Sequence, residues 1–309
     1  MTPAVRAVDL TKTFGRERAI ESVSFEAQPG ELFGLVGPDG AGKSTLLRML
    51  AGVLRPTSGD AEVFGTSVAR DPERVKTEIA YMSQRFGLYS DLTVLENLSF
   101  YADLYEVPRA ERAARLERLF QFSSLKPFSD RLAGKLSGGM KQKLGLSCAL
   151  IHEPRLLLLD EPTFGVDPIS RRDLWLMVHE MVARGVTAVV STAYLDEAER
   201  FDRLLLLHRG RILDSGTPEE LLGRIEGEIL DLRATPLREA RAVLLRHPAV
   251  LRVAIFGDRL HVSVRSVARD RSALEAALRE AGVSVHEIAP IAPTLEDLFI
   301  EAVSKAEAA

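Results

Sequence analysis

The chain has 309 residues, of which 46% are hydrophobic and 27% charged, and its formal net charge is −4 at pH 7. This charge gives no global electrostatic basis for nucleic-acid binding, and the single cysteine, Cys148, excludes an internal disulfide framework. No apolar run approaches the roughly 18 residues of a membrane-spanning helix, and the first residues lack the apolar core of a signal peptide. We therefore expect a cytoplasmic protein that is long enough for two domains.

A glycine-rich segment at residues 37–45 follows two expected strands, at 5–14 and 20–27, and an apolar run at 32–36. A helical run comes next, and strand, turn and helix is the setting that a phosphate-binding P-loop requires. The glycines let the backbone curl around phosphate oxygens, and the N–H groups at the helix start attract the anion. The segment consists of Gly37, Pro38, Asp39, Gly40, Ala41, Gly42, Lys43, Ser44 and Thr45.

Within this segment, Gly37, Gly42, Lys43 and Ser44 match the spacing of a P-loop. We expect Lys43 to reach the β- and γ-phosphates of a nucleotide and the Ser44 hydroxyl to ligate Mg²⁺. Phe14, at the end of the first strand, either offers a face on which adenine stacks or belongs to the core, which is the commoner place for a phenylalanine. The residues alone leave both interpretations open.

Gln84 begins a loop after two short strands, expected at residues 61–64 and 79–82. Its amide would sense Mg²⁺ and the water that attacks the γ-phosphate, unless it is a solvated loop residue. The chain then becomes helical at residues 93–105, where apolar residues recur with the 3.6-residue period, and at 109–122. The Arg and Glu residues of this second helix are typical of a solvated face.

Ser137 is a natural N-cap for a third helix that should extend to Leu150. The two residues that follow it, Gly138 and Gly139, leave N–H groups free for an anion at the helix start. A plain helix cap explains the same residues, so the sequence around Ser137 leaves both interpretations open.

Asp160 and Glu161 follow an apolar strand at residues 155–159, which suits the middle of a parallel sheet. They therefore lie at the carboxyl end of a strand, where open α/β sheets bind ligands. Asp160 would hold Mg²⁺ directly or through water. Glu161 would orient or deprotonate the water that attacks the γ-phosphate. A simple helix N-terminus is the weaker interpretation, because Pro162 and a P-loop accompany the two acids.

The remaining part of the first domain should contain a helix at residues 169–184, a strand at 187–191 and a hairpin around Gly210. From residue 225 the order becomes β-α-β-β-α-β, which is typical of a small ferredoxin-like domain. Its elements are expected at residues 228–233, 237–246, 250–256, 260–265, 272–280 and 284–288.

No catalytic constellation occurs in this second domain. Its three histidines, His247, His261 and His286, lack the spacing of metal ligands, so we expect a structural or regulatory role. Thr294 should cap a last helix.

Taken together, five motifs in the right order resemble the ATP-binding subunits of ABC transporters over residues 5 to about 222. The matching segments are residues 37–45 as Walker A, Gln84 as the Q-loop, residues 136–140 as the signature, residues 156–161 as Walker B with the catalytic glutamate, and residues 164–167 as the D-loop. The C-terminal part of the chain, including residues 293–299, looks like the accessory domain of the ABC-2-type export branch, which includes drug, polysaccharide and lipid exporters.

The resemblance implies an α/β fold, a P-loop NTPase core of the ABC ATPase kind with a parallel sheet and an antiparallel β-subdomain. It also implies an α-helical subdomain at about residues 86–153 and a small α+β ferredoxin-like domain at the C-terminus. The expected domains are residues 1–224 and 225–309. ATP and Mg²⁺ are the implied cofactors, with Glu161 and Gln84 in the hydrolysis of ATP.

The resemblance further implies a head-to-tail pair, in which ATP lies between the P-loop of one domain and residues 137–139 of the other. The second ATP-binding domain would come from an identical or a different chain. Integral membrane permease subunits would contact residues 85–89 and the helices up to Phe122. The chain would thus be peripheral on the inner face of the cell membrane, and no nucleic acid is expected.

Three positions depart from the pattern of the family. Asp39 replaces the usual Asn, Met140 replaces Gln, and Ala193 replaces the His that contacts the γ-phosphate. A methyl group can neither donate a hydrogen bond nor carry charge, and losing one such transition-state contact costs roughly 10²–10³ in rate. We therefore expect slow hydrolysis at this chain's own P-loop and an asymmetric pair whose other half carries the full set.

Two other functions stay open. A non-transport ABC protein of translation or repair would carry a second ATP-binding domain, a coiled-coil or zinc insertion, or a basic patch, and the sequence shows none of these. A nucleotide-binding regulatory protein with little turnover is favoured by Ala193 and opposed by Glu161. A P-loop kinase has no use for the signature at residues 136–140.

Overall fold

The computed structural model describes residues 2–84 and 87–308. By internal packing the chain divides into two units, residues 1–215 and 216–309. The short helix α7 (Pro218–Leu222) opens the second unit, where Thr217 and Glu220 form a reciprocal capping box.

A six-stranded sheet forms the centre of the first unit. Its strands, in spatial order, are β10 (Arg211–Gly216), β9 (Arg203–His208), β3 (Leu32–Val36), β8 (Thr187–Thr192), β7 (Leu156–Asp160) and β6 (Ile79–Met82). The pairs from β9 to β6 are parallel. Every residue of β3, β7 and β8 is buried, as expected for strands that are covered on both faces.

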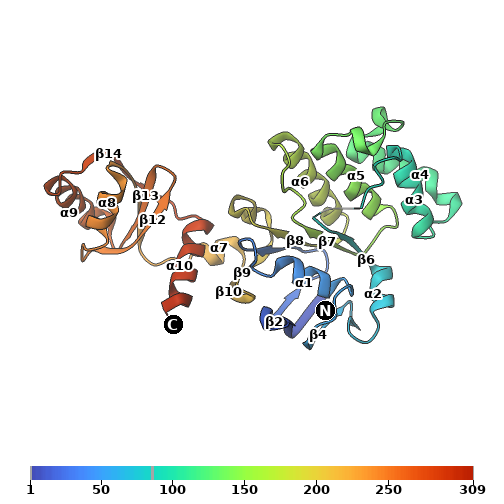
Figure 1. Ribbon diagram of the computed structural model, residues 1–309, viewed down its shortest axis with the longest axis horizontal. Helices are drawn as coiled ribbons and strands as arrows, with labels where there is room; N and C mark the ends of the chain where they lie inside the picture. The colour runs from blue at the N-terminus through green and yellow to red at the C-terminus, as the bar shows by residue number, and fades with distance from the viewer. Residues whose placement is uncertain (1, 85–86, 309) are drawn as a thin grey trace. The chain divides into compact units, whose positions relative to one another are not determined.

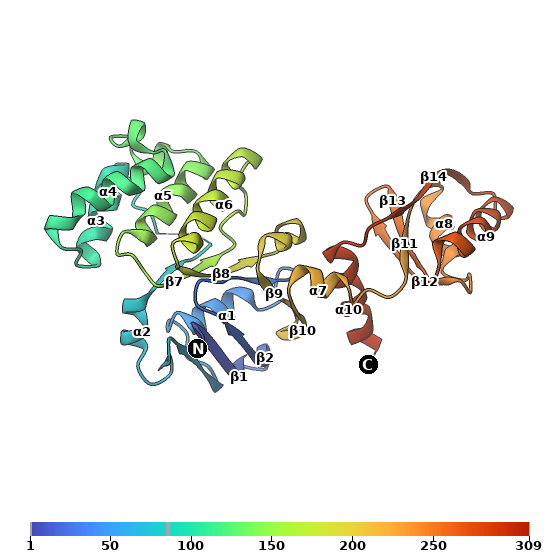
Figure 2. The ribbon, with the colours of Figure 1, turned by 180° about the vertical axis from the view of Figure 1, so that it is seen from behind.

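Helices cover both faces of this sheet. Figures 1 and 2 show α1 (Lys43–Leu50) on one face and α5 (Gly138–Leu150) and α6 (Pro168–Ala183) on the other. The helix α1 begins at Lys43, because Gly42 is its N-cap, with a left-handed φ of 106°. The P-loop therefore passes directly from the buried strand β3 into α1.

An antiparallel sheet completes the core of the first unit. Its strands, in spatial order, are β2 (Glu17–Ala27), β1 (Val5–Phe14), β4 (Ser58–Val63) and β5 (Thr66–Ser67). A helix that we did not predict, α2 (Pro72–Glu78), follows them. The Asp71 side chain accepts a hydrogen bond from the Arg74 N–H and Pro72 occupies the first turn, which is a usual helix start.

The expected helical region is present. It consists of α3 (Val94–Leu104), α4 (Arg109–Ser123), the 3-10 turns η1 (Lys126–Phe128) and η2 (Ala133–Lys135), and α5. Thr93 and Glu96 cap α3 reciprocally, and the Ser137 hydroxyl accepts a hydrogen bond from the Met140 N–H, at 3.3 Å, as an N-cap should. In the part of the chain that the structure describes, no helix combines the length and apolar character needed to cross a bilayer.

The second unit has the expected β-α-β-β-α-β order. Its elements are β11 (Glu228–Thr235), α8 (Leu237–Leu244), β12 (Val250–Phe256), β13 (Arg259–Val264), α9 (Val267–Glu280) and β14 (Ser284–Ile291). The strands pair antiparallel in the order β12-β13-β11-β14. One face of this sheet and the helices α8 and α9 enclose an apolar core that includes Leu230, Leu232 and Leu274.

The last helix, α10 (Leu295–Ala308), is tied to the strands β12 and β13 by polar contacts. His261 Nδ1 lies 2.8 Å from Asp297 Oδ1, and Arg252 forms an ion pair of 2.7 Å with Glu301. Thr294 accepts a hydrogen bond from the Asp297 N–H, which confirms the predicted cap. The contact between His261 and Asp297 therefore joins β13 to α10.

Candidate functional site

A cavity of about 640 Å³ lies over the P-loop in the first unit. A volume of this size is typical of small-molecule sites. Its described lining residues are Phe14, Glu17, Arg18, Ala19, Asp39, Gly40, Ala41, Gly42, Lys43, Ser44, Thr45, Gln84, Glu161, Phe164 and Arg209. The fold thus brings most of the predicted nucleotide-binding residues to one cavity.

The P-loop backbone is fixed by its neighbours. Gly40 and Gly42 have left-handed φ angles of 77° and 106°, which glycine adopts without strain. The Gly37 N–H donates to the Thr192 carbonyl at 3.2 Å, and the Gly210 N–H donates to the Ala41 carbonyl at 3.0 Å. The end of β8 and the turn between β9 and β10 therefore hold the loop in a curled conformation.

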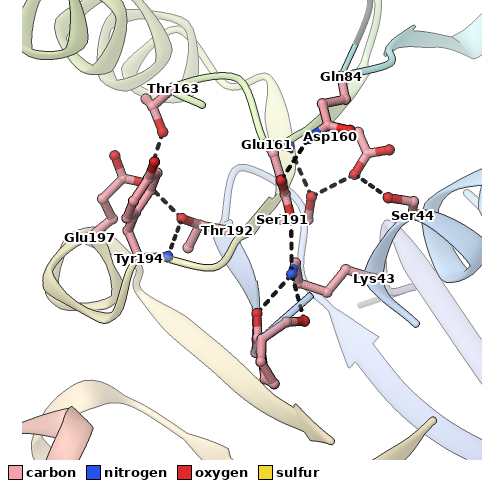
Figure 3. Close-up of polar contacts among 12 residues, drawn as sticks. Lys43, Ser44, Gln84, Asp160, Glu161, Thr163, Ser191, Thr192, Tyr194 and Glu197 are labelled. Carbon is pink, nitrogen blue, oxygen red and sulfur yellow. Dashed lines mark hydrogen bonds and ion pairs between the residues drawn. The ribbon is translucent and has the colours of Figure 1, made fainter. Parts of the chain in front are cut away.

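Lys43 is buried, with 3% of its surface exposed. Its ammonium group donates to the carbonyls of Gly37 and Pro38, at 2.7 and 3.0 Å. It also lies 2.9 Å from Glu161 Oε1, so Figure 3 shows one cation bound by three oxygens. The Glu161 carboxylate therefore contacts the Lys43 ammonium group, where we expected a nucleotide phosphate.

Asp160, which is 1% exposed, gathers hydroxyl groups at the end of β7. Its Oδ1 accepts from Ser44 Oγ at 2.9 Å and from Ser191 Oγ at 2.8 Å, while its Oδ2 accepts from Tyr81 at 3.4 Å. Burial, with the charge of Asp160, raises the pKa of Tyr81, so the phenol keeps its proton. Hydroxyl and carboxylate oxygens are hard ligands, and the pair Ser44 and Asp160 therefore fits Mg²⁺.

Gln84 contacts the predicted base directly. Its Nε2 donates to Glu161 Oε2 at 3.0 Å, so both oxygens of this carboxylate have a partner. Glu161 itself has a left-handed φ of 48°, an uncommon conformation for a residue with a side chain that is often found at functional sites. Residues 85 and 86, which we expected to face a membrane partner, lie outside the described residues.

Phe14 is 49% exposed at the rim of the cavity. The Lys12 ammonium group lies 5.1 Å from the centre of its ring. The core interpretation of Phe14 is therefore wrong. Stacking on adenine stays a prediction.

The signature residues Ser137, Gly138 and Gly139 are not among the described residues that line the cavity. They lie beside the start of α6, where a Cβ on Gly139 would come within 2.1 Å of Ser170 Oγ. Ser137 and Gly138 are exposed. Both residues therefore lie on the surface of the first unit, as a head-to-tail pair requires.

Replacement of Gly139 by Ala should destabilise the first unit by about 1–3 kcal/mol, because the added methyl group overlaps Ser170 in a packed interface. Gly138→Ala is a matched control, since the nearest atom to its Cβ would be 3.8 Å away. Urea unfolding of both variants measures the difference. Equal stability of the two variants would contradict this packing of the signature against α6.

Three features of the site had no clear signal in the sequence. Arg18 and Arg209 line the cavity, yet neither belongs to a motif that we identified. Glu197 is 1% exposed and accepts hydrogen bonds from Thr163 and Thr192. Its local sequence reads as a polar surface turn.

Comparison with protein families agrees with this geometry. The family model described as "ABC transporter" matches residues 20–164. The model described as "ATP-binding protein DrrA1-3-like, C-terminal domain" matches residues 216–303. The first match lies in the first unit and the second match lies in the second unit.

Individual relatives cover nearly all of the chain. It is 45% identical over 286 residues to the "Probable multidrug ABC transporter ATP-binding protein YbhF" of Escherichia coli, covering 92% of this chain and 49% of that protein. The chain therefore spans about half the length of this relative. It is also 34% identical to the "Nod factor export ATP-binding protein I" of Rhizobium etli. That alignment covers 96% of this chain and 92% of that protein.

A solved structure entitled "Structure of ATP binding subunit of ABC transporter" has a TM-score of 0.66 and 32% identity, covering 72% of this chain and 92% of that chain. The phosphate cradle, the paired acids after β7 and these similarities lead to one conclusion. The chain belongs to the ATP-binding proteins of ABC transporters, a family of P-loop ATPases.

Proposed function

We propose that this chain is the ATP-binding subunit of an ABC-2-type export system, and that it drives transport through separate integral membrane subunits. The names of its relatives include multidrug transport and Nod factor export, which supports the export branch. The observation that carries the proposal is the continuous set of contacts from Lys43 through Glu161 to Gln84, above a glycine cradle.

Binding of ATP is the first step that these contacts explain. The γ-phosphate competes with Glu161 for Lys43, because both are anions and the cation has room for few partners. Mg²⁺, held by Ser44 and Asp160, would neutralise charge on the phosphates. Displacement of Glu161 from Lys43 then frees its carboxylate for a water molecule.

Hydrolysis follows from the freed carboxylate. Glu161 takes a proton from water, the water oxygen forms a bond with the γ-phosphorus, and the bond from that phosphorus to the β-phosphate oxygen breaks to leave ADP. Gln84, which contacts Glu161 here, orients the same water. Ala193 offers no side-chain donor to the γ-phosphate, so we expect this site to turn over slowly.

A second ATP-binding domain completes the site in this proposal. Ser137 and Gly138 are exposed outside the cavity, and they would cap the ATP of a partner. A partner with a complete set of motifs makes the pair asymmetric. Residues 1–224 would be the ATP-binding domain and residues 225–309 an accessory domain, on the inner face of the cell membrane.

Lys43→Ala should weaken MgATP binding by at least about 2 kcal/mol, which is roughly 30-fold in Kd, because a buried charge that contacts phosphate is lost. Lys76→Ala is the control, since Lys76 lies on α2 and forms an ion pair with Glu73 on the same helix, away from the residues that line the cavity. Titration with a fluorescent ATP analogue measures both. Equal affinities for the two variants would contradict phosphate binding at Lys43.

Purification of the tagged chain from membranes tests the transport part of the proposal. We expect multi-span permease subunits to copurify with it. Copurification with ribosomes instead would favour the non-transport function. A regulatory role without turnover is the second candidate because of Ala193, and single-turnover hydrolysis separates it from an ATPase.

A further inference from the structure

A buried carboxylate, Glu197, lies outside the nucleotide cavity and takes no part in the proposed chemistry. It belongs to the 3-10 segment η3 (Leu195–Arg200) that follows β8, and it is 1% exposed. A charge without water needs a full set of hydrogen-bond donors. Its partners therefore show which parts of the fold it connects.

Both oxygens of Glu197 accept hydrogen bonds from buried side chains. Oε2 accepts from Thr163 Oγ1 at 3.0 Å and from Thr192 Oγ1 at 2.7 Å, as Figure 3 shows. Oε1 accepts from the Trp175 indole N–H at 3.0 Å, and the Arg171 guanidinium lies 3.7 Å away. The donors come from three separate segments of the chain.

Two of these donors adjoin the proposed chemistry. Thr163 lies two residues after Glu161, in a turn that the hydrogen bond from the Phe164 N–H to the Glu161 carbonyl closes. Thr192 ends β8, immediately before Ala193, and its carbonyl accepts from the Gly37 N–H of the P-loop. A single carboxylate thus joins the turn that carries the base to the strand end that touches the phosphate cradle.

The loop after β8 depends on the same contacts. The Thr192 hydroxyl donates to Glu197 and accepts from the Tyr194 N–H at 3.0 Å. Arg171 stacks over the Tyr194 ring at 4.4 Å. Ala193 has no side chain that could reach a phosphate, and these contacts help to position the loop after β8 relative to the site.

We propose that Glu197 is a positioning residue, which holds the Glu161 turn and the end of β8 in register, so that ATP hydrolysis depends on it while ATP binding does not. The inference rests on the proposed function, because it needs hydrolysis at this chain's own P-loop. In the proposed function the nucleotide contacts residues 37–45, and the hydrogen bonds and the ion pair described for Glu197 are made to other residues.

Glu197→Gln in the full chain is the primary test. The amide keeps the shape, but its NH₂ group faces either the two threonine hydroxyls or the Trp175 indole N–H, so at least one hydrogen bond is lost or reversed. A misplacement of about 1 Å can cost up to 10²-fold in rate, and we expect the single-turnover rate to fall by ~10- to 100-fold. The Kd for MgATP should stay within about twofold, as for an interaction that acts only in the transition state.

The three donors provide matched variants. Thr163→Val and Thr192→Val replace the hydroxyl group by a methyl group of similar size and should each lower the single-turnover rate, whereas Thr163→Ser and Thr192→Ser keep the hydroxyl and should retain the wild-type rate. Trp175→Phe removes the donor from α6, which does not carry the base, so it should lower the melting temperature and leave the rate unchanged.

Several outcomes would overturn the inference. A wild-type rate for Glu197→Gln would do so, and so would a loss of rate in Trp175→Phe that equals the loss in the two valine variants, because a merely structural role affects all donors alike. A wild-type chain that binds MgATP and never hydrolyses it would contradict the proposed function, and the positioning role with it.

Discussion

Replacement of Glu161 by Gln should lower the rate of ATP hydrolysis by about 10²–10⁴-fold, the range for loss of a general base. The amide keeps the shape of the side chain and its contact with Gln84, but it cannot take a proton from water. The variant should bind MgATP as tightly as the wild type or more tightly. The carboxylate that lies 2.9 Å from the Lys43 ammonium group, and that competes with phosphate for it, is then absent. Single-turnover hydrolysis and an ATP titration measure the two effects.

Glu199→Gln is the control for this variant. Glu199 lies on η3 and is exposed. Its replacement by Gln removes the same charge as Glu161→Gln does, but at a residue that does not line the cavity. It should hydrolyse ATP at the wild-type rate. Hydrolysis by Glu161→Gln at that same rate would show that another group acts as the base.

Ala193→His should raise the rate of hydrolysis by this chain by about 10- to 100-fold, somewhat less than the roughly 10²–10³-fold cost of removing such a contact from an optimised site. Position 193 follows Thr192, whose carbonyl accepts a hydrogen bond from the N–H of the P-loop residue Gly37, and we expect an imidazole there to donate to the γ-phosphate. The ATPase rate of the purified chain, alone and with its partner domain, measures the change.

Ala193→Leu separates this effect from bulk, because leucine fills a similar volume without a donor. It should leave the rate at the low wild-type value. If the wild-type chain alone already hydrolyses ATP at the rate of complete family members, the asymmetric pair is wrong, and Ala193→His should then change little.

The nucleotide cradle was predictable because its signals are local. Residues close together in the sequence determine both features. The spacing of Gly42, Lys43 and Ser44 specifies the turn, and the apolar run before Asp160 specifies the strand and its end. The β-α-β-β-α-β order of the second unit is equally local, since alternating strand and helix patterns determine it. The structure confirms the turn before α1, the strand that ends at Asp160 and the order of the elements in the second unit. Nucleotide binding at the cradle stays a prediction.

Contacts between distant segments were not predictable. The ion pair between Lys43 and Glu161 joins residues that are far apart in the sequence, and the bond between Thr163 and Glu197 spans 34 positions. No periodicity marks such partners, because they depend on how the strands are ordered in the sheet. The exposure of the Phe14 side chain could not be predicted for the same reason, because its place at the rim of the cavity depends on how β1 packs.

A structure of the full chain with MgATP in the Glu161→Gln variant tests the central claim most directly. We expect the phosphates within the backbone of residues 37–45, with Ser137 and Gly138 of a second ATP-binding domain closing the opposite side. Phosphates bound away from the cradle would contradict that claim. So would a pair in which those two residues face no nucleotide.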